Sequence, residues 1–409
     1  MNQSTADLIP DLNTPFFLFE EEVLQNEIDS LKVALKKYWP NYKIGYSVKT
    51  NSFPPLASYL QTQGILAEVV SEDEYQLARR IGYTSSELIC NGPIKKRSWI
   101  EELLADNILL NIDSHREITY VSEYANQHPD QELHVGLRIN LHLETAFPNE
   151  SNAGSEGSRF GFCAENKELS RVIKRLSNHP NITISGLHLH TSTKTRSVEI
   201  YRWLVSQFAK LAKEYDLDQI QYIDIGGGFY GGIPDKPNWE DYLKGISDEL
   251  RLNNYLPESL TLIIEPGASL LAGCFSYFCE VIDVKQNINQ HLITLNGSRI
   301  HIDPLMHKTT YFHKIIRKKR EASNSFITDQ QQLTGFTCLE NDRFFKLCNE
   351  PLLEEGDIIE FNKVGAYTLT LAPLFITYYP EVYVHRMNGK IECLRKKWGV
   401  DEFLQLSKI

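Results

Sequence analysis

The sequence lacks any paired-cysteine pattern. It contains seven cysteines, an odd number, and no Cys-x-x-Cys pair. A secreted disulfide framework uses an even number of cysteines, and a structural zinc site uses closely spaced pairs. We therefore expect free thiols in a reducing, cytoplasmic compartment, and no metal site.

Long apolar runs and basic residues are also scarce. No stretch approaches the roughly 18 consecutive apolar residues that cross a bilayer. The chain has 42 Lys and Arg against 53 Asp and Glu, which gives a net charge of −11. An acidic chain is repelled by nucleic-acid phosphates and by anionic lipid. We expect neither nucleic acid nor a membrane as a partner.

What is present is a long alternation of strand-like and helix-like segments. A chain of 409 residues is too long for a single core, so two domains are expected. Between residues 41 and 270, amphipathic stretches separate eight β-rich runs. These runs are Lys43–Val48, Ile65–Val70, Glu87–Cys90, Ile108–Ile112, Glu132–Ile139, Thr183–His190, Gln221–Ile225 and Thr261–Glu265. Eight such units suit a (β/α)8 TIM barrel, although a doubly wound open sheet has the same alternation.

Past residue 275 the pattern changes to short strand-like runs with turn residues between them. The runs are Phe275–Lys285, His291–Leu295, Asp357–Phe361 and Val382–Arg386. The opening Phe16–Phe19 has the same character and is expected to join them. We therefore expect an α/β plus all-β chain. Residues 36–275 would form the barrel, and residues 1–35 plus 276–409 a β-domain.

Chemically capable residues follow the ends of the predicted strands, where TIM barrels place their active sites. Lys49 follows the first run. A lysine there can form a Schiff base with an aldehyde cofactor, although a surface lysine is the plainer interpretation. The other residues at strand ends are Glu68, Ser71, Asn91, Asp113, Arg138, Asn140, His188, His190, Gly226, Gly227, Gly228, Glu265, Pro266 and Gly267.

Three features among these residues favour a phosphorylated, planar ligand. Gly226-Gly227-Gly228 after a strand lets backbone N–H groups cradle a phosphate, although a tight turn explains the triplet equally well. Glu265 ends a buried apolar strand, where a carboxylate needs a partner such as a protonated ring nitrogen. The flat ring of His190 could stack on a planar cofactor or simply belong to the core.

The order of these motifs resembles the fold-type III pyridoxal-phosphate decarboxylases. This alanine-racemase-like group includes the diaminopimelate, ornithine, arginine and carboxynorspermidine decarboxylases. The motifs that carry the resemblance are Tyr46-x-x-Lys49-x-Asn51, His188-x-His190, Gly226–Phe229, Glu265-Pro266-Gly267, Gly335–Asp342, Gly356-Asp357 and Gly365-Ala366-Tyr367. The resemblance implies a carboxy-lyase that uses pyridoxal 5'-phosphate and removes the α-carboxylate of an amino acid.

The resemblance also implies individual roles. Lys49 would hold the cofactor, Glu265 would keep its pyridine nitrogen protonated, and His190 would stack on its ring. The residues expected at the phosphate or as polar support are Gly226, Gly227, Gly228, Gly267, Thr193, Tyr367, Glu68 and Arg138. Cys338 would protonate the product carbanion from across a homodimer with shared active sites. Glu340 and Asp342 would line the substrate pocket.

The chain departs from the family pattern at two informative positions. Ala268 follows Gly267 where the family usually has an arginine, so one cationic contact is missing. Leu339 directly follows Cys338 where the diaminopimelate enzymes have an acid, and the acid comes one position later, at Glu340. These changes weaken the case for meso-diaminopimelate. They favour a substrate with a distal amine or other polar group, in siderophore, polyamine or natural-product biosynthesis.

Several alternatives stay open. Diaminopimelate decarboxylation in lysine biosynthesis is the first. An amino-acid racemase and a non-catalytic pyridoxal-phosphate-binding protein are possible on the same fold. An NAD-dependent enzyme on a doubly wound sheet ranks last, because the glycine triplet lacks the Gly-x-Gly-x-x-Gly spacing.

Overall fold

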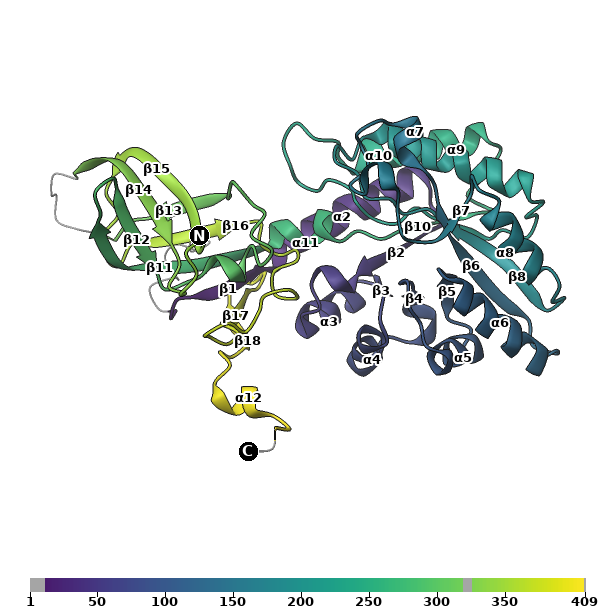
Figure 1. Ribbon diagram of the computed structural model, residues 1–409, viewed down its shortest axis with the longest axis horizontal. Helices are drawn as coiled ribbons and strands as arrows, with labels where there is room; N and C mark the ends of the chain where they lie inside the picture. The colour runs from purple at the N-terminus through teal and green to yellow at the C-terminus, as the bar shows by residue number, and fades with distance from the viewer. Residues whose placement is uncertain (1–11, 319–325, 408–409) are drawn as a thin grey trace. The chain divides into compact units, whose positions relative to one another are not determined.

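Eight parallel strands close into a barrel in the computed structural model, which describes residues 12–318 and 326–407 (Figure 1). The barrel strands are β2 (Tyr42–Ser47), β3 (Leu66–Val69), β4 (Leu88–Cys90), β5 (Leu109–Ile112), β6 (Leu133–Asn140), β8 (Ile182–His188), β9 (Tyr222–Asp224) and β10 (Thr261–Ile264). Each one lies within a residue or two of a run predicted from the sequence. The two-residue β7 (Phe162–Cys163) pairs with β6 beside the barrel.

Two pairings decide between a closed barrel and an open sheet. β10 pairs in parallel with β2, and β5 pairs in parallel with β6. A doubly wound sheet has two edge strands. With these pairings, none of the eight strands is an edge strand. The (β/α)8 prediction is confirmed, and the open-sheet alternative is wrong.

Helices follow the strands and cover the outside of the barrel (Figure 1). They are α2 (Glu21–Tyr38), α3 (Pro54–Thr62), α4 (Glu72–Ile81), α5 (Arg97–Ala105), α6 (His115–Gln127), α8 (Glu168–Leu176), α9 (Val198–Glu214) and α10 (Trp239–Leu252). Serine caps begin two of them directly after strand ends. Ser71 Oγ accepts from Glu74 N at 3.2 Å, and Ser114 Oγ accepts from Glu117 N at 3.4 Å. The loops that follow β3 and β5 are therefore short.

A mixed sheet forms the second unit of the chain. Its central strand β11 (Phe275–Gln286) pairs antiparallel with β1 (Phe16–Glu20), and β1 pairs in parallel with β17 (Glu381–His385). Phe16 stacks on Phe278 with ring centroids 4.9 Å apart. The remaining strands are β12 (His291–Leu295), β13 (His313–Ile316), β14 (Ile327–Thr334), β15 (Arg343–Pro351), β16 (Ile358–Asn362) and β18 (Ile391–Arg395).

The chain divides into units at residues 26/27 and 269/270. Residues 27–269 form the barrel unit, and the residues on either side form the β-unit. The expected boundary at 35/36 falls inside helix α2, which runs through it without a break. From Glu27 onward this helix contacts the barrel unit, since Trp239 Nε1 donates to Glu27 Oε2 at 3.4 Å. Among the described residues, no helix combines the length and apolarity needed to cross a bilayer.

Candidate active site

Lys49 lies directly after β2, in the short 3-10 helix Val48–Thr50. Its Nζ donates to Glu68 Oε2 at 2.7 Å and to Ser47 Oγ at 2.6 Å. The Lys49 side chain is 41% exposed, whereas that of Glu68 is only 1% exposed. The amine therefore reaches the open end of the barrel while its carboxylate partner is held in the interior. This arrangement suits a lysine that must meet an incoming aldehyde.

Asn91 connects Glu68 to a second buried carboxylate. Its Nδ2 donates to Glu68 Oε1 at 3.1 Å and to Glu265 Oε1 at 2.6 Å. The sequence placed Asn91 at a strand end without assigning it a task. Only the closed barrel brings β4 opposite β10, and so brings the Asn91 amide between two carboxylates.

Glu265 lies in a strongly polar yet buried environment. Asp224 lies beside it, and burial together with the charge of Glu265 raises the pKa of Asp224 well above its ordinary value. His188 Nε2 lies 3.5 Å from Glu265 Oε2. The carboxyl groups of Asp224 and Glu265 are both buried and close together, so they cannot both carry a charge at low cost. A proton therefore stays with Asp224. Glu265 is then free to pair with a cationic ring nitrogen.

The two histidines at the carboxyl end of β8, His188 and His190, are neutral. Burial lowers the pKa of His190 to about 3 and lowers that of His188 well below its ordinary value. Arg138 adds to both effects, since its Nη1 lies 3.1 Å from His188 Nε2 and its Nη2 donates to His190 O at 2.7 Å. Gly227 N donates to His190 Nδ1 at 3.2 Å, which requires that nitrogen to be unprotonated. A neutral, held ring is suited to stacking on a planar group.

The glycine triplet is built for close approach. Gly226 and Gly228 have φ values of +69° and +90°, which favour glycine. A Cβ on Gly226 would lie 2.3 Å from His190 Cβ, and one on Gly227 would lie 2.2 Å from Glu265 O. These contacts leave no room for a side chain at Gly226 or Gly227, so the backbone of the triplet is not covered by side chains of its own. A bare backbone of this kind suits close approach by a phosphate.

Thr193 and Gly267 are the two other barrel residues that were expected near the phosphate. Thr193 is 9% exposed, and its Oγ1 accepts from Arg196 N at 3.1 Å. A Cβ on Gly267 would lie 2.3 Å from Thr50 Oγ1. Within the described residues, the buried Thr50 Oγ1 and Ser269 Oγ have no hydrogen-bond partner in the protein. Thr50 Oγ1 therefore leaves an unpaired polar atom beside Gly267, which fits a bound polar group.

His188, Asp224 and Glu265 could in principle hold a metal ion, because one ligand atom from each lies within 4.8 Å of the others. The Arg138 guanidinium at 3.1 Å from His188 opposes a divalent cation there. The same carboxylates already accept hydrogen bonds from Asn91 and from neighbouring amides. The donor set therefore fits an organic cation better than a metal.

The remaining predicted residues lie in the β-unit, which is described by itself. Cys338 is exposed, and Tyr367 is 44% exposed with φ +57°. The Glu340 carboxylate is 98% exposed and lies 3.3 Å from Arg343 Nη2. Asp342 differs from these, because it is buried and accepts hydrogen bonds from Ser298 Oγ at 2.9 Å and from Thr337 Oγ1 at 2.5 Å. In this unit Asp342 braces the loop that carries Cys338.

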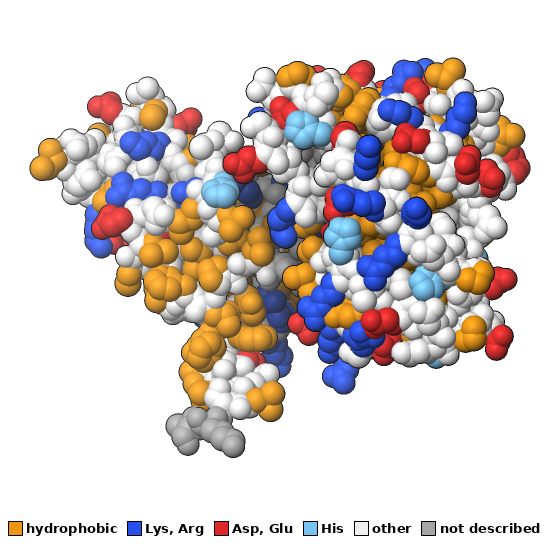
Figure 2. Space-filling model, turned by 45° about the vertical axis from the view of Figure 1, so that its right-hand side comes forward, with side chains coloured by type: hydrophobic (Ala, Val, Ile, Leu, Met, Phe, Trp, Pro, Cys, Tyr) orange, Lys and Arg blue, Asp and Glu red, His pale blue; other side chains and the backbone are white. Residues whose placement is uncertain are grey.

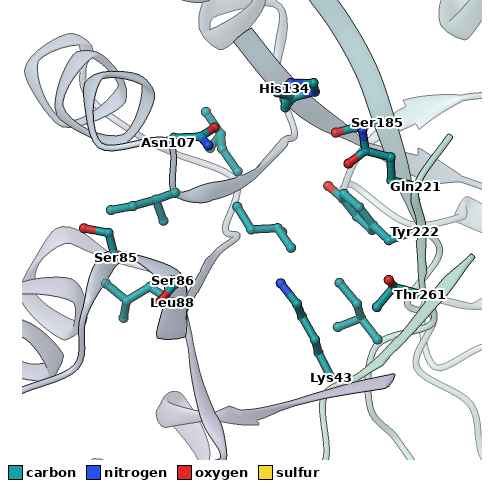
Figure 3. Close-up of a pocket in the computed structure, with 14 residues that line it drawn as sticks. Lys43, Ser85, Ser86, Leu88, Asn107, His134, Ser185, Gln221, Tyr222 and Thr261 are labelled. Atoms are coloured by element: carbon teal, nitrogen blue, oxygen red, sulfur yellow. The ribbon is translucent and has the colours of Figure 1, made fainter. Parts of the chain in front are cut away.

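A cavity of about 280 Å³ lies at the other end of the barrel. Figure 3 shows the side chains of Lys43, His134, Gln221 and Tyr222 around it. These residues stand at the amino ends of their strands, whereas Lys49 and Glu265 follow carboxyl ends. Barrel enzymes carry out their chemistry at the carboxyl ends, so this cavity is not the active site.

A lysine, a buried carboxylate, a neutral histidine and a glycine triplet at one end of a TIM barrel are the features that a pyridoxal-phosphate enzyme needs. Residues 25–272 match the family model described as pyridoxal-dependent decarboxylase, pyridoxal binding domain. The chain belongs to this family, and it is a pyridoxal-phosphate-dependent carboxy-lyase.

Known relatives match nearly the whole chain. A diaminopimelate decarboxylase of Aquifex aeolicus is 24% identical over 415 residues, covering 99% of this chain and 94% of that protein. An L-glutamyl-[BtrI acyl-carrier protein] decarboxylase of Niallia circulans is 25% identical over 434 residues, covering 99% and 96%. The crystal structure of a diaminopimelate decarboxylase from M. jannaschi is 21% identical, with a TM-score of 0.85 over 99% of this chain and 94% of that one. The last likeness supports the fold.

Proposed function

We propose that this enzyme removes the α-carboxylate of an amino-acid-type substrate with a distal amine or other polar group. The observation that carries the proposal is the difference in burial between two acids of the loop that carries Cys338. Asp342 is buried and braces the loop, whereas Glu340 presents an exposed carboxylate two residues from the thiol. Ala268 adds no cation for a distal carboxylate. The acid at Glu340 and the missing cation at Ala268 each favour a distal ammonium over a distal carboxylate.

The barrel residues have distinct tasks in this proposal. Bound pyridoxal phosphate supplies the electron sink that accepts the electron pair of the Cα–carboxylate bond. The Lys49 amine, positioned by Glu68, would hold the cofactor through its aldehyde group. Glu265 would pair with the pyridine nitrogen and keep it protonated, and the His190 ring would stack on the cofactor ring. The Gly226–Gly228 triplet, with Thr193 and Gly267, would bind the phosphate.

Cys338 supplies the proton that replaces the lost carboxylate. We propose that Cys338 of the partner subunit acts on each site, so the enzyme would be a homodimer with two shared sites. The β-unit supports this, because Figure 2 shows hydrophobic side chains gathered on one of its faces. Exposed apolar side chains of this unit include Leu371, Phe375, Ile376, Val400 and Phe403. The seven free cysteines support a cytoplasmic location.

The curated relatives favour a second candidate. Several are diaminopimelate decarboxylases, including the Aquifex aeolicus protein and one from Helicobacter pylori that is 25% identical over 414 residues. The relative that acts on a glutamyl group carried by a protein suggests a larger substrate. The pathway would be lysine synthesis for diaminopimelate, and siderophore, polyamine or natural-product synthesis for an amine-ended substrate.

Substitution of Glu340 distinguishes the candidates. Glu340→Gln should raise KM for the amine-ended substrate by about tenfold or more while kcat changes less, because a distal ion pair contributes binding. Glu355→Gln removes an equal charge from an exposed position of the same unit and should leave both constants unchanged. An unchanged KM in Glu340→Gln would reject the amine-binding role. It would leave diaminopimelate or a carrier-attached substrate as the better candidate.

A further inference from the structure

A chain of hydrogen bonds runs through the centre of the barrel towards Glu265. Tyr222 OH donates to Asn111 Oδ1 at 2.8 Å. Asn111 Nδ2 donates to Asn91 Oδ1 at 2.9 Å and to Asp224 Oδ2 at 3.2 Å. Asn91 then donates to Glu265 at 2.6 Å. The chain therefore reaches the proposed partner of the pyridine nitrogen from the opposite end of the barrel.

The carboxylate end of this hydrogen-bond chain determines which side-chain atoms donate and which accept. An ionised carboxylate only accepts hydrogen bonds, so the Asn91 amide must turn its NH₂ towards Glu68 and Glu265. Its carbonyl oxygen then faces Asn111, which must donate to it. The carbonyl oxygen of Asn111 in turn needs a donor, and the Tyr222 hydroxyl supplies it. Without that hydroxyl, the buried carbonyl oxygen of Asn111 loses its donor, and the amide is held less firmly.

The fold makes dedicated space for this tyrosine. Tyr222 is 7% exposed at the start of β9. A Cβ on Gly186 would lie 2.1 Å from the Tyr222 ring, and one on Gly136 would lie 2.1 Å from its hydroxyl. Two neighbouring strands thus have glycine where any other residue would displace the phenol. In Figure 3, Tyr222 lines the cavity at the amino end of the barrel.

We propose that Tyr222 and Asn111 are positioning residues that hold the Asn91 amide against Glu265. They thereby set the position of the carboxylate that would pair with the cofactor ring. The proposal rests on the proposed function of Glu265. Side-chain amides do not readily give up or take up protons, so the chain orients groups and does not conduct protons. Its effect should therefore appear in the electronic state of the bound cofactor as well as in turnover.

The test compares two buried tyrosines in the full-length, cofactor-loaded protein. Tyr222→Phe removes only the hydroxyl that donates to Asn111 Oδ1. Tyr83→Phe is the matched control, because Tyr83 is 2% exposed and its hydroxyl donates to Ala57 O at 2.9 Å, outside this network. Asn111→Ser is a second variant that breaks the chain one step nearer Glu265. Circular dichroism checks the folding of each variant.

The readouts are the absorbance spectrum of bound pyridoxal phosphate and its dissociation constant. In Tyr222→Phe and Asn111→Ser we expect a changed ratio of the cofactor's absorbance bands and affinity weakened by about tenfold, the effect of one lost buried hydrogen bond. Tyr83→Phe should keep the wild-type spectrum. A wild-type spectrum and affinity in Tyr222→Phe would overturn the positioning role while the wild-type enzyme still decarboxylates. A wild-type protein that binds no cofactor would overturn the proposed function as well.

Discussion

Asn91 donates a 2.6 Å hydrogen bond to Glu265, although 174 positions separate them in the chain. The contact joins the ends of β4 and β10, which are not neighbours in the barrel. The same amide also donates to Glu68, which holds Lys49. One side chain thus links the cofactor's proposed covalent anchor to the proposed partner of its ring nitrogen.

Substitution of Asn91 should therefore disturb both partners at once. Asn91→Asp places a carboxylate where Glu68 and Glu265 need a donor, so like charges meet in a buried site. We expect cofactor affinity to fall by about 10- to 100-fold, because one to two pKa units of unfavourable interaction correspond to such a change. Fluorescence titration with pyridoxal phosphate measures it. Asn126→Asp, at an exposed position, should bind like the wild type. Equal affinity in both variants would show that the bridge is unimportant.

The phosphate cradle proposed at Gly226–Gly228 gives a steric prediction. Gly226→Ala introduces a Cβ 2.3 Å from His190 Cβ at a φ of +69°. Strain in the left-handed region and displacement of His190 should weaken pyridoxal phosphate binding by about tenfold or more. Gly273→Ala is the control, since no atom lies within 4 Å of its added Cβ. If Gly226→Ala bound the cofactor as tightly as Gly273→Ala, the triplet would be an ordinary turn.

The neutral His190 ring predicts a pH-dependent stability in cofactor-free protein. An unfolded histidine takes up a proton near pH 6.5, whereas folded His190 has a pKa of about 3. Between these values the unfolded state binds more protons, so the free energy of unfolding falls as pH is lowered. The contribution of this ring is up to about 1.4 kcal/mol per pH unit.

Urea unfolding at several pH values between about 4 and 7 isolates that contribution. His190→Gln cannot titrate and should lose less stability than the wild type over this range. His307→Gln, at an exposed histidine, should follow the wild-type curve. Parallel curves for His190→Gln and the wild type would mean that the folded ring accepts a proton at an ordinary pKa.

Local sequence patterns predicted the barrel because each of its strands is a short apolar run between amphipathic helices. They did not predict β14, where Gln331 and Gln332 interrupt the apolar pattern although both side chains are buried. Their amides donate to Pro351 O and Phe345 O, each at 3.0 Å. Such residues look polar in the sequence and become core only once β15 supplies the acceptors.

The candidate active site also contains both residues that the sequence singles out and residues that it does not. Lys49, Glu265 and the glycine triplet stand out because their residue types are unusual at strand ends. Asn111 and Tyr222 do not, because an asparagine and a tyrosine in apolar strands carry no chemical signature. Their role depends on hydrogen bonds across the barrel, between strands far apart in the chain. Closure of the barrel, which periodicity alone could not establish, is what brings them together.

The most direct test of the account is mass spectrometry of the cofactor-loaded enzyme with a set of amino-acid substrates. The set contains diaminopimelate, lysine, ornithine, arginine, carboxynorspermidine and a glutamyl carrier protein, each with wild-type enzyme and with Lys49→Ala. The account predicts that a member with a distal amine loses carbon dioxide with the wild type. Lys49→Ala should be at least about a thousandfold slower, because the activated lysine is removed. Exchange of the Cα proton without loss of carbon dioxide, or full turnover by Lys49→Ala, would contradict it.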